Sequence, residues 1–575
     1  MTHREQQGFN ANDHSKFNIG KVVQNFAPPE TRDNSETKLL NAVKNEVAGR
    51  LAQSLHRRVY VELDKTEDPS QVTPPWSMDV KLGNRPSQRC PEGTHIVKIF
   101  DKPEIGGQLL ILGAPGSGKT TLLLQLAEKL VQRGEENAKA PVPVLLNLSA
   151  WKTQYSDIPS WMVTDLRQKY GVPKDIAEAW IETGRILPLL DGLDELMSQR
   201  QDTCVQALND FLPDWRGIPL VVCSRLEEYQ VYESNLELNG SVIVQPLTDA
   251  QIETYLRRAK CDWLWEAICR DVDIINPATG LARSPLFLSM LVLASDNLPP
   301  ELWELDKNAT ERRRILFEAY IEARLSRPYR GGENYLVESK TGDRRQPKRK
   351  PVPNPYPKDE RTKRWLGWLA ARSIEEAQTE LFIEKLQPYF LKNRQQKFVF
   401  GLAGDPGTIN TVETIKISWR SASAPRNFYK EIQEGLVFGL VGGLVGEEID
   451  TKVNDNQGIH QSIKNSLIFG IIFMVIGILI SAALHYFHEP MQLSEILVLG
   501  TGIGFVLGAS NGGLLSAIKH CALRITLWLF GYAPWNYSKF LRYCTDRGFL
   551  QRVGGGYRFV HALLRDHFAD HYDPS

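Results

Sequence analysis

The chain has 575 residues, enough for several domains with large cores, and its equal numbers of basic and acidic residues give a formal net charge of zero. This balance excludes a global field that would attract nucleic acid or an anionic membrane. The seven cysteines form no C-x-x-C pair, which disfavours a disulfide framework or a zinc–cysteine cluster, and the polar N-terminal residues do not resemble a cleaved signal peptide.

The N-terminal region divides into a polar segment and a helix. Residues 1–35 are rich in Asn, Gln, Thr and charge, and we expect them to be disordered. Apolar residues then recur at helical spacing and predict an amphipathic helix over 36–60. We favour docking of this helix against the next domain, with partner binding as the alternative. A proline-bearing loop completes the segment 36–94.

A phosphate-binding motif organises the rest of the chain. Residues 107–127 read GQLLILGAPGSGKTTLLLQLA, a strand, a glycine-rich turn and a helix, and the turn fits G-x-x-x-x-G-K-[ST]. Its backbone N–H groups and the helix N-terminus would hold phosphate oxygens. Lys119 would reach the β- and γ-phosphates, and the Thr120 hydroxyl would bind Mg²⁺. The candidate nucleotide-binding residues here are Gly113, Ala114, Pro115, Gly116, Ser117, Gly118, Lys119, Thr120 and Thr121.

An acidic group follows the next strongly apolar strand. Residues 186–196 read ILPLLDGLDEL, as expected for a parallel strand that is buried on both faces. Its acids come at the strand end where open α/β sheets bind ligands. Asp191 would hold Mg²⁺, usually through water, and Glu195 would orient or deprotonate the attacking water. Asp194 can share either duty. We therefore expect ATP/ADP and Mg²⁺ as cofactors.

Further strands complete an α/β P-loop NTPase fold with a parallel sheet and flanking helices. Strands are predicted over 142–148, 218–223 and 242–247, and a helix over 158–169. Ser224 and Arg225 follow one of these strands and could sense the γ-phosphate, although Arg225 could equally form an ordinary salt bridge. Thr248 and Gln251 have the spacing of a capping box at the start of the next helix.

The C-terminal half changes composition several times. Helical spacing over 281–294 and 310–325 predicts a helical domain. Residues 327–364 are basic and proline-rich; we favour an exposed linker over a nucleic-acid contact and do not expect nucleic acid as a partner. A helical pattern over 365–391 would begin a winged-helix-like unit that the C-terminal residues complete.

An uncharged insertion interrupts that unit. Residues 466–484 and 496–518 carry no charge over about the 20 residues that span a bilayer. The flanking basic residues predict an α-helical transmembrane hairpin with the NTPase domain and both termini cytoplasmic. A buried hairpin in a soluble protein is the alternative. The segment 435–446 is too short to span alone, and G-x-x-x-G spacings there and over 500–508 would favour self-association in lipid.

The predicted divisions follow from these patterns. They are a disordered N-terminus (1–35), a helix and linker (36–94), a nucleotide-binding domain (95–247), a helical domain (248–326), a basic proline-rich linker (327–364), the first part of a winged-helix-like region (365–400), a glycine-rich membrane insertion (401–530) and the second part of the winged-helix-like region (531–575).

The strings GAPGSGKTT, LPLLDGLDE, VVCSR and QPLT resemble the NACHT domain of STAND-type signalling NTPases, particularly short bacterial forms. The resemblance implies a switch that ADP holds closed and ATP opens, with slow hydrolysis and self-association on activation by an unknown ligand. It also implies that Pro285, in ARSPLFLSML, packs near the adenine. His561, in GYRFVHALLRDHFA, would contact the ADP β-phosphate in the closed state.

Three functions remain open at this point. The first is a membrane-anchored signalling switch, for which a role in bacterial defence rests on the resemblance alone. The second is an oligomerising effector that permeabilises membranes under control of the NTPase. The third is a nucleic-acid-stimulated ATPase that uses the basic stretch.

Overall fold

A computed structural model describes residues 32–62, 77–329, 354–401 and 514–572, with short gaps, together with scattered positions between 463 and 478. Several predictions fall outside these described residues. They concern the disordered N-terminus over 1–31, most of the basic linker (330–353) and the glycine-rich segment 435–446.

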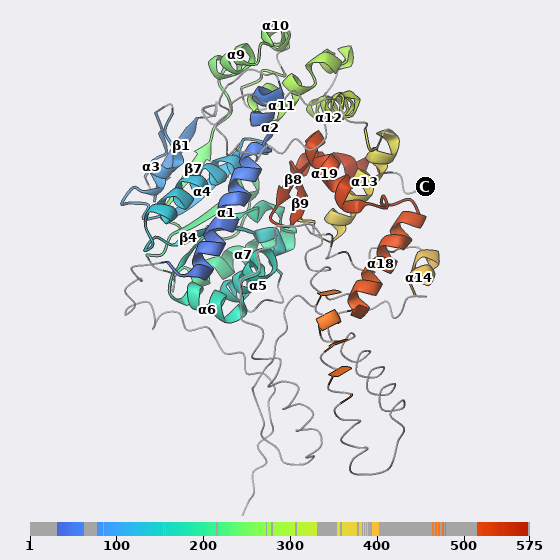
Figure 1. The fold of residues 1–575 in the computed structure, drawn as a ribbon. Coiled ribbons are helices and arrows are strands. Elements are labelled where there is room, and N and C mark those ends of the chain that lie inside the picture. Colours follow the sequence, from blue (N-terminus) through green and yellow to red (C-terminus); the bar gives the residue numbers. More distant parts are fainter. Residues whose placement is uncertain are drawn as a thin grey trace, which may run out of the picture.

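A sheet in the order β2-β1-β7-β3-β6-β5-β4 forms the centre of the first half of the molecule (Figure 1). The five strands from β7 to β4 are parallel. The parallel α/β part of the predicted fold class is therefore present. The strand bounds are β1 (Met78–Leu82), β2 (Gln88–Arg89), β3 (Gln108–Gly113), β4 (Val142–Asn147), β5 (Ile186–Asp191), β6 (Leu220–Arg225) and β7 (Gly240–Val244).

The edge of this sheet differs from the sequence prediction. β1 pairs antiparallel with β7 and with β2, in a stretch that we interpreted as a proline-bearing loop. Only some side chains of β1 are buried. Its sequence, MDVKL, therefore need not be apolar throughout and lacks the continuous apolar run by which we recognised the central strands. Residues 96–100 form a short helix immediately before the strand that leads into the phosphate loop.

Helices cover both faces of the sheet, as layered α/β folds require. Their bounds are α1 (Asn34–Ala52), α2 (Leu55–Glu62), α3 (Ile96–Phe100), α4 (Lys119–Glu136), α5 (Ile158–Tyr170), α6 (Lys174–Glu182), α7 (Ser198–Phe211) and α8 (Leu226–Gln230). Helix α1 lies beside α4 (Figure 1). Its apolar residues Leu39, Val43 and Val47 are buried in the core of the nucleotide domain. The N-terminal helix therefore docks, as favoured.

The start of α1 is ordered before residue 36. Asp33 is the N-cap residue, and its side chain accepts a hydrogen bond from the Glu36 N–H at 2.6 Å. Arg32 donates to the carbonyl of Ala140 at 2.8 Å. Residues 32–35 therefore belong to the folded domain rather than to a disordered end.

A buried ion pair anchors α1, and its removal is expected to destabilise the protein. Arg185 donates to Glu36 at 2.7 Å, and both side chains are less than one tenth exposed. Arg185→Ala leaves the Glu36 carboxylate buried without this partner, and we expect a loss of about 3–5 kcal/mol in the free energy of unfolding. Urea unfolding measures this loss. Lys44→Ala, which breaks the exposed Lys44–Glu135 pair, is the control and should cost about 0–1 kcal/mol; equal effects would contradict the assignment.

The second half of the described chain has its own hydrophobic core. The expected capping box opens α9, because Thr248 and Gln251 exchange hydrogen bonds. The bounds are α9 (Asp249–Arg258), α10 (Asp262–Arg270), α11 (Pro285–Leu293), α12 (Ala309–Ser326), α13 (Asp359–Glu375), α14 (Arg394–Gly401), α18 (Leu514–Leu529), α19 (Tyr537–Arg547), β8 (Leu550–Val553), β9 (Gly556–Phe559) and α20 (Ala562–Asp570).

Segments on either side of the insertion lie together in this half. Helix α13 packs against α20, and β8 pairs antiparallel with β9. Leu381 adds a β-bridge to Tyr557 of β9. This arrangement of helices around a hairpin resembles the winged-helix-like unit that we expected from two separated parts, although the domain boundaries themselves stay a prediction.

The prediction of a transmembrane hairpin, and with it of a multi-pass membrane protein, is wrong. Within the part of the chain that the structure describes, no helix combines the length and apolar composition needed to cross a bilayer. Residues 466–484 are described only in part, and 496–513 lie outside the described residues. The described end of the second predicted span instead begins α18, which carries Lys519 and Arg524 and packs against α14. We carry the membrane-permeabilising alternative no further.

Candidate nucleotide site

The phosphate-binding loop connects β3 to α4. Gly116 and Gly118 have φ values of +75° and +101°, which only glycine adopts readily. A side chain at Gly116 would also lie 2.7 Å from the Ser284 hydroxyl, so the loop has no room for a larger residue. Lys119 is the first residue of α4, whose first N–H groups have no partner within the helix. These free donors are what a phosphate group requires.

Lys119 folds back over its own loop. Its ammonium group donates to the carbonyl oxygens of Gly113 at 2.9 Å and Ala114 at 3.0 Å. Burial lowers the pKa of Lys119, an effect that the Asp194 carboxylate opposes. The side chain therefore lies at the loop and must give up these carbonyls to contact a phosphate.

Thr120 and Asp191, the two predicted magnesium ligands, lie next to each other. The Thr120 hydroxyl lies 3.1 Å from a carboxylate oxygen of Asp191, at the end of β5. Two arginines from distant parts of the chain approach the same carboxylate. Arg50 of α1 lies 3.7 Å and Arg558 of β9 lies 3.6 Å from its Oδ2 atom. The positive charges of these two arginines balance the negative charge of the Asp191 carboxylate, as a bound Mg²⁺ would.

The predicted catalytic acids have different partners. Asp194 pairs with Arg225, whose Nε atom lies 2.8 Å from Oδ2 and whose backbone N–H donates to Oδ1 at 3.1 Å. Arg225 also pairs with Glu228 at 2.9 Å, while Ser224 before it is fully buried. The structure thus shows the salt bridge that we weighed as the alternative role of Arg225.

Glu195 is the acid with the environment of a general base. Burial raises its pKa, and Arg558 opposes the shift. The amide of Asn147, at the end of β4, lies 3.5 Å from its Oε2 atom and also donates to Thr379 at 2.9 Å. Gly192, with φ of +79°, lets the chain turn so that Glu195 approaches Asn147. A raised pKa suits a group that accepts a proton near neutral pH.

The first turn of α11 rests on the phosphate-binding loop. The Ser284 hydroxyl and the Leu286 N–H donate to the Gly116 carbonyl at 3.1 and 3.3 Å. Pro285 lies between them as the first residue of α11, where its missing N–H costs nothing. The structure therefore brings Pro285 next to the loop, although the two are far apart in sequence.

His561 lies in the C-terminal unit, three residues after Arg558. It is the N-cap of α20, and its Nδ1 atom accepts a hydrogen bond from the Leu563 N–H at 3.1 Å. Burial lowers the pKa of His561 to about 3, with further contributions from Lys119 and Arg225. The ring is therefore neutral, within electrostatic reach of the loop, and carries its proton on Nε2.

Arg50, Asn147 and Arg558 are site residues that the sequence did not indicate. Arg50 lies on a helix that we identified only by its apolar face, and Arg558 lies in a short C-terminal strand. Neither belongs to a motif with a known spacing. Of the three residues, Asn147 alone could have been found from the sequence, because it is a polar residue at the end of a buried strand, and that strand pairs with the one that ends in Asp191.

The residues present fit a nucleotide with Mg²⁺. Ser117 in the loop has a buried hydroxyl with no hydrogen-bond partner among the described residues. Two glycines with positive φ surround the position that phosphate takes, and Thr120 with Asp191 offers oxygen ligands of the kind that Mg²⁺ prefers. Together with the parallel sheet, these features define a P-loop NTPase site.

Comparison with known proteins also indicates a P-loop NTPase. Residues 108–262 match the family model of the NACHT domain, so the NACHT part of the predicted resemblance is confirmed from β3 to the start of α10, and the STAND-type and bacterial parts stay a prediction. No curated protein matches the chain. A solved structure, "Crystal structure of Cdc6p from Pyrobaculum aerophilum", has 13% identity and a TM-score of 0.21, covering 83% of this chain and 91% of that chain. A similarity this weak implies nothing further about the chain.

Proposed function

We propose that the chain is an ATP-hydrolysing switch that its C-terminal unit holds closed in the ADP state. One observation supports this most directly: Arg558 of the winged-helix-like unit lies 3.6 Å from Asp191 at the nucleotide site, and His561 follows three residues later in the same unit. The α1 helix adds Arg50 from the other end of the chain. A nucleotide bound at the loop would therefore contact elements that need not stay together, as a conformational switch requires.

Each site residue has a role in this proposal. ATP supplies the phosphoanhydride bond that is hydrolysed. Lys119 and the N–H groups at the start of α4 bind the phosphates, and Thr120 with Asp191 binds Mg²⁺. Glu195 accepts the proton of the attacking water, with Asp194 assisting through Arg225. Pro285 packs near the adenine, and Ser224 with Arg225 responds to the γ-phosphate.

The closed arrangement supports slow, regulatory hydrolysis. Arg50 and Arg558 approach the carboxylate that must bind Mg²⁺, and Asp194 holds Arg225. Opening must separate the C-terminal unit from the loop before these groups become available. We propose that this opening also exposes surface for self-association. The activating ligand and a role in bacterial defence rest on the resemblance alone.

Arg558→Gln tests whether the C-terminal unit restrains the enzyme. The change removes the positive charge beside Asp191, so we expect basal ATP hydrolysis to rise about tenfold, a typical coupling between sites. Steady-state phosphate release measures the effect, and the melting temperature reports on folding. Arg542→Gln, at an exposed position on α19, is the control. A stable Arg558→Gln protein with unchanged or lower activity would overturn the proposed restraint.

His561→Ala tests the proposed contact with ADP. The neutral ring carries a proton on Nε2 that can be donated to a phosphate oxygen, and its loss should weaken ADP binding about tenfold. Binding of ATP in the open state should change less, because the C-terminal unit has then moved away. Fluorescence titration with labelled ADP and ATP compares the two. Unchanged ADP affinity would count against the contact.

A further inference from the structure

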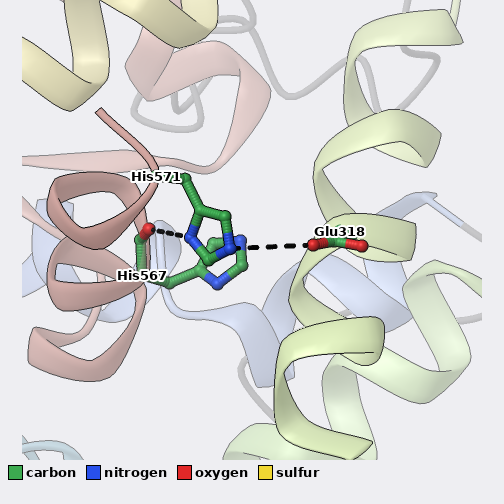
Figure 2. Close-up of side chains that lie close together, drawn as sticks. All are labelled: Glu318, His567 and His571. Atoms are coloured by element: carbon green, nitrogen blue, oxygen red, sulfur yellow. Dashed lines mark hydrogen bonds and ion pairs between the residues drawn. The ribbon is translucent and has the colours of Figure 1, made fainter. Parts of the chain in front are cut away.

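A second cluster of metal-binding side chains lies away from the phosphate loop, between α12 and α20 (Figure 2). It consists of Glu318 of α12 and of His567 and His571, which are one helical turn apart at the end of α20. One ligand atom from each residue lies within 4.8 Å of the others. Two histidines four residues apart on a helix place both rings on one face, as in known zinc motifs.

The ring of His571 is oriented as metal-bound histidines are. Its Nδ1 atom lies 2.8 Å from the carbonyl oxygen of His567, so this nitrogen carries the proton and donates it. The Nε2 atom then has the free lone pair and lies 3.8 Å from Oε1 of Glu318 (Figure 2). Zinc-binding histidines usually donate their other ring N–H to a carbonyl or carboxylate, which fixes the tautomer in this way.

His567 supplies the second nitrogen from a buried position. Its ring packs against Phe317, with the centroids 5.2 Å apart, and against the ring of His571. Only 8% of the His567 residue is exposed to solvent. The packing also holds the ring in place before any metal arrives.

Small rotations would bring the three ligands into coordination. Tetrahedral Zn²⁺ with bonds of about 2.0–2.1 Å places its ligand atoms about 3.4 Å apart. The side chains of His571 and Glu318 are 46% and 44% exposed, so both have room to move by the required distance of about 1 Å. Arg314 competes, because it pairs with Glu318 at 2.7 Å. Two imidazoles favour Zn²⁺ over Mg²⁺ or Ca²⁺, which prefer oxygen ligands.

We propose that Glu318, His567 and His571 form a Zn²⁺ site that joins the helical domain to the C-terminal unit. The three residues leave one tetrahedral position for water. By joining α12 to α20, bound Zn²⁺ stabilises the arrangement in which the C-terminal unit lies at the nucleotide site, a consequence that rests on the proposed function. Metal binding itself requires only the contact between α12 and α20, so it can be measured in the absence of nucleotide.

The binding test uses the untagged full-length protein and Zn²⁺ alone, in competition with a chromophoric chelator. We expect one site that is lost, or weakened at least tenfold, in both His571→Ala and Glu318→Gln. The matched controls are His95→Ala and Glu322→Gln, which replace exposed residues of the same types, the second one turn along α12. Wild-type affinity in His571→Ala, or equal losses in the controls, would overturn the proposal.

Three further measurements separate this site from other zinc binding, because exposed cysteines such as Cys269 and Cys521 also bind Zn²⁺. The Co²⁺-loaded protein should lack the intense thiolate charge-transfer band, whereas cysteine ligation would produce it and contradict the assignment. Arg314→Gln should strengthen binding by freeing Glu318, and weaker binding would count against the site. The Zn²⁺-dependent rise in melting temperature should disappear in His571→Ala but persist in His95→Ala.

Discussion

Replacing Lys119 with alanine is expected to abolish nucleotide binding. The ammonium group lies at the phosphate-binding loop, held by the Gly113 and Ala114 carbonyls. With nucleotide present it would exchange these neutral partners for phosphate oxygens, and charge-assisted hydrogen bonds of this kind contribute about 1.5–3 kcal/mol each. Loss of two such contacts should weaken ATP and ADP binding by at least about 100-fold.

Calorimetry with ATP and with ADP measures this loss directly. Lys129→Ala is the matched control, because Lys129 lies on the same helix with an exposed side chain and, among the described residues, hydrogen-bonds to a neighbouring glutamine. Removal of Lys119 takes a partly desolvated charge out of the fold, so the melting temperature without nucleotide should not fall. Nucleotide affinity within threefold of wild type in Lys119→Ala would refute the role of the loop.

The change Glu195→Gln should separate ATP binding from hydrolysis. Glutamine keeps the size of the side chain and its contact with Asn147 but cannot accept a proton. We expect hydrolysis to fall by about 10²–10⁴-fold while ATP affinity stays unchanged. The protein should then accumulate in the ATP state, and light scattering should detect more self-association than in the wild-type protein.

The control for Glu195 is Glu227→Gln, which alters an exposed carboxylate at the start of α8. A pH profile adds a second criterion. Because burial raises the pKa of Glu195, the wild-type rate should fall as the pH drops, at a pH above the ordinary range of glutamate. Normal turnover in Glu195→Gln would show that another group, with Asp194 the next candidate, accepts the proton.

The sequence predicted those parts of the site that depend on local patterns. The loop from Gly113 to Thr120 needs particular residues at fixed spacing, and the strand before Asp191 is recognisable by its continuous apolar run. The structure brings these residues together because the carboxyl ends of β3 and β5 meet at one edge of the sheet. Pro285 and His561 were found only through the family resemblance.

The contacts of Arg50 and Arg558 with Asp191 could not be predicted in the same way. Each arises from packing between segments more than a hundred residues apart, and neither arginine differs from a surface arginine in its sequence context. The membrane prediction failed for a related reason. Hydropathy measures composition over a window of residues. It does not reveal that the end of the second predicted span begins a charged helix, α18, that packs against α14.

The residues of this site lie far apart in the sequence, so they are synthesised at different times during translation. The NACHT match ends at residue 262, whereas Arg558 and His561 come almost at the end of the chain. At about 5–20 residues per second, synthesis of the intervening segment takes on the order of 15–60 s. During that interval the loop and Asp191 are already present, whereas Arg558 and His561 are not. The nascent chain therefore passes, each time it is made, through a state in which Asp191 lacks its contact with Arg558.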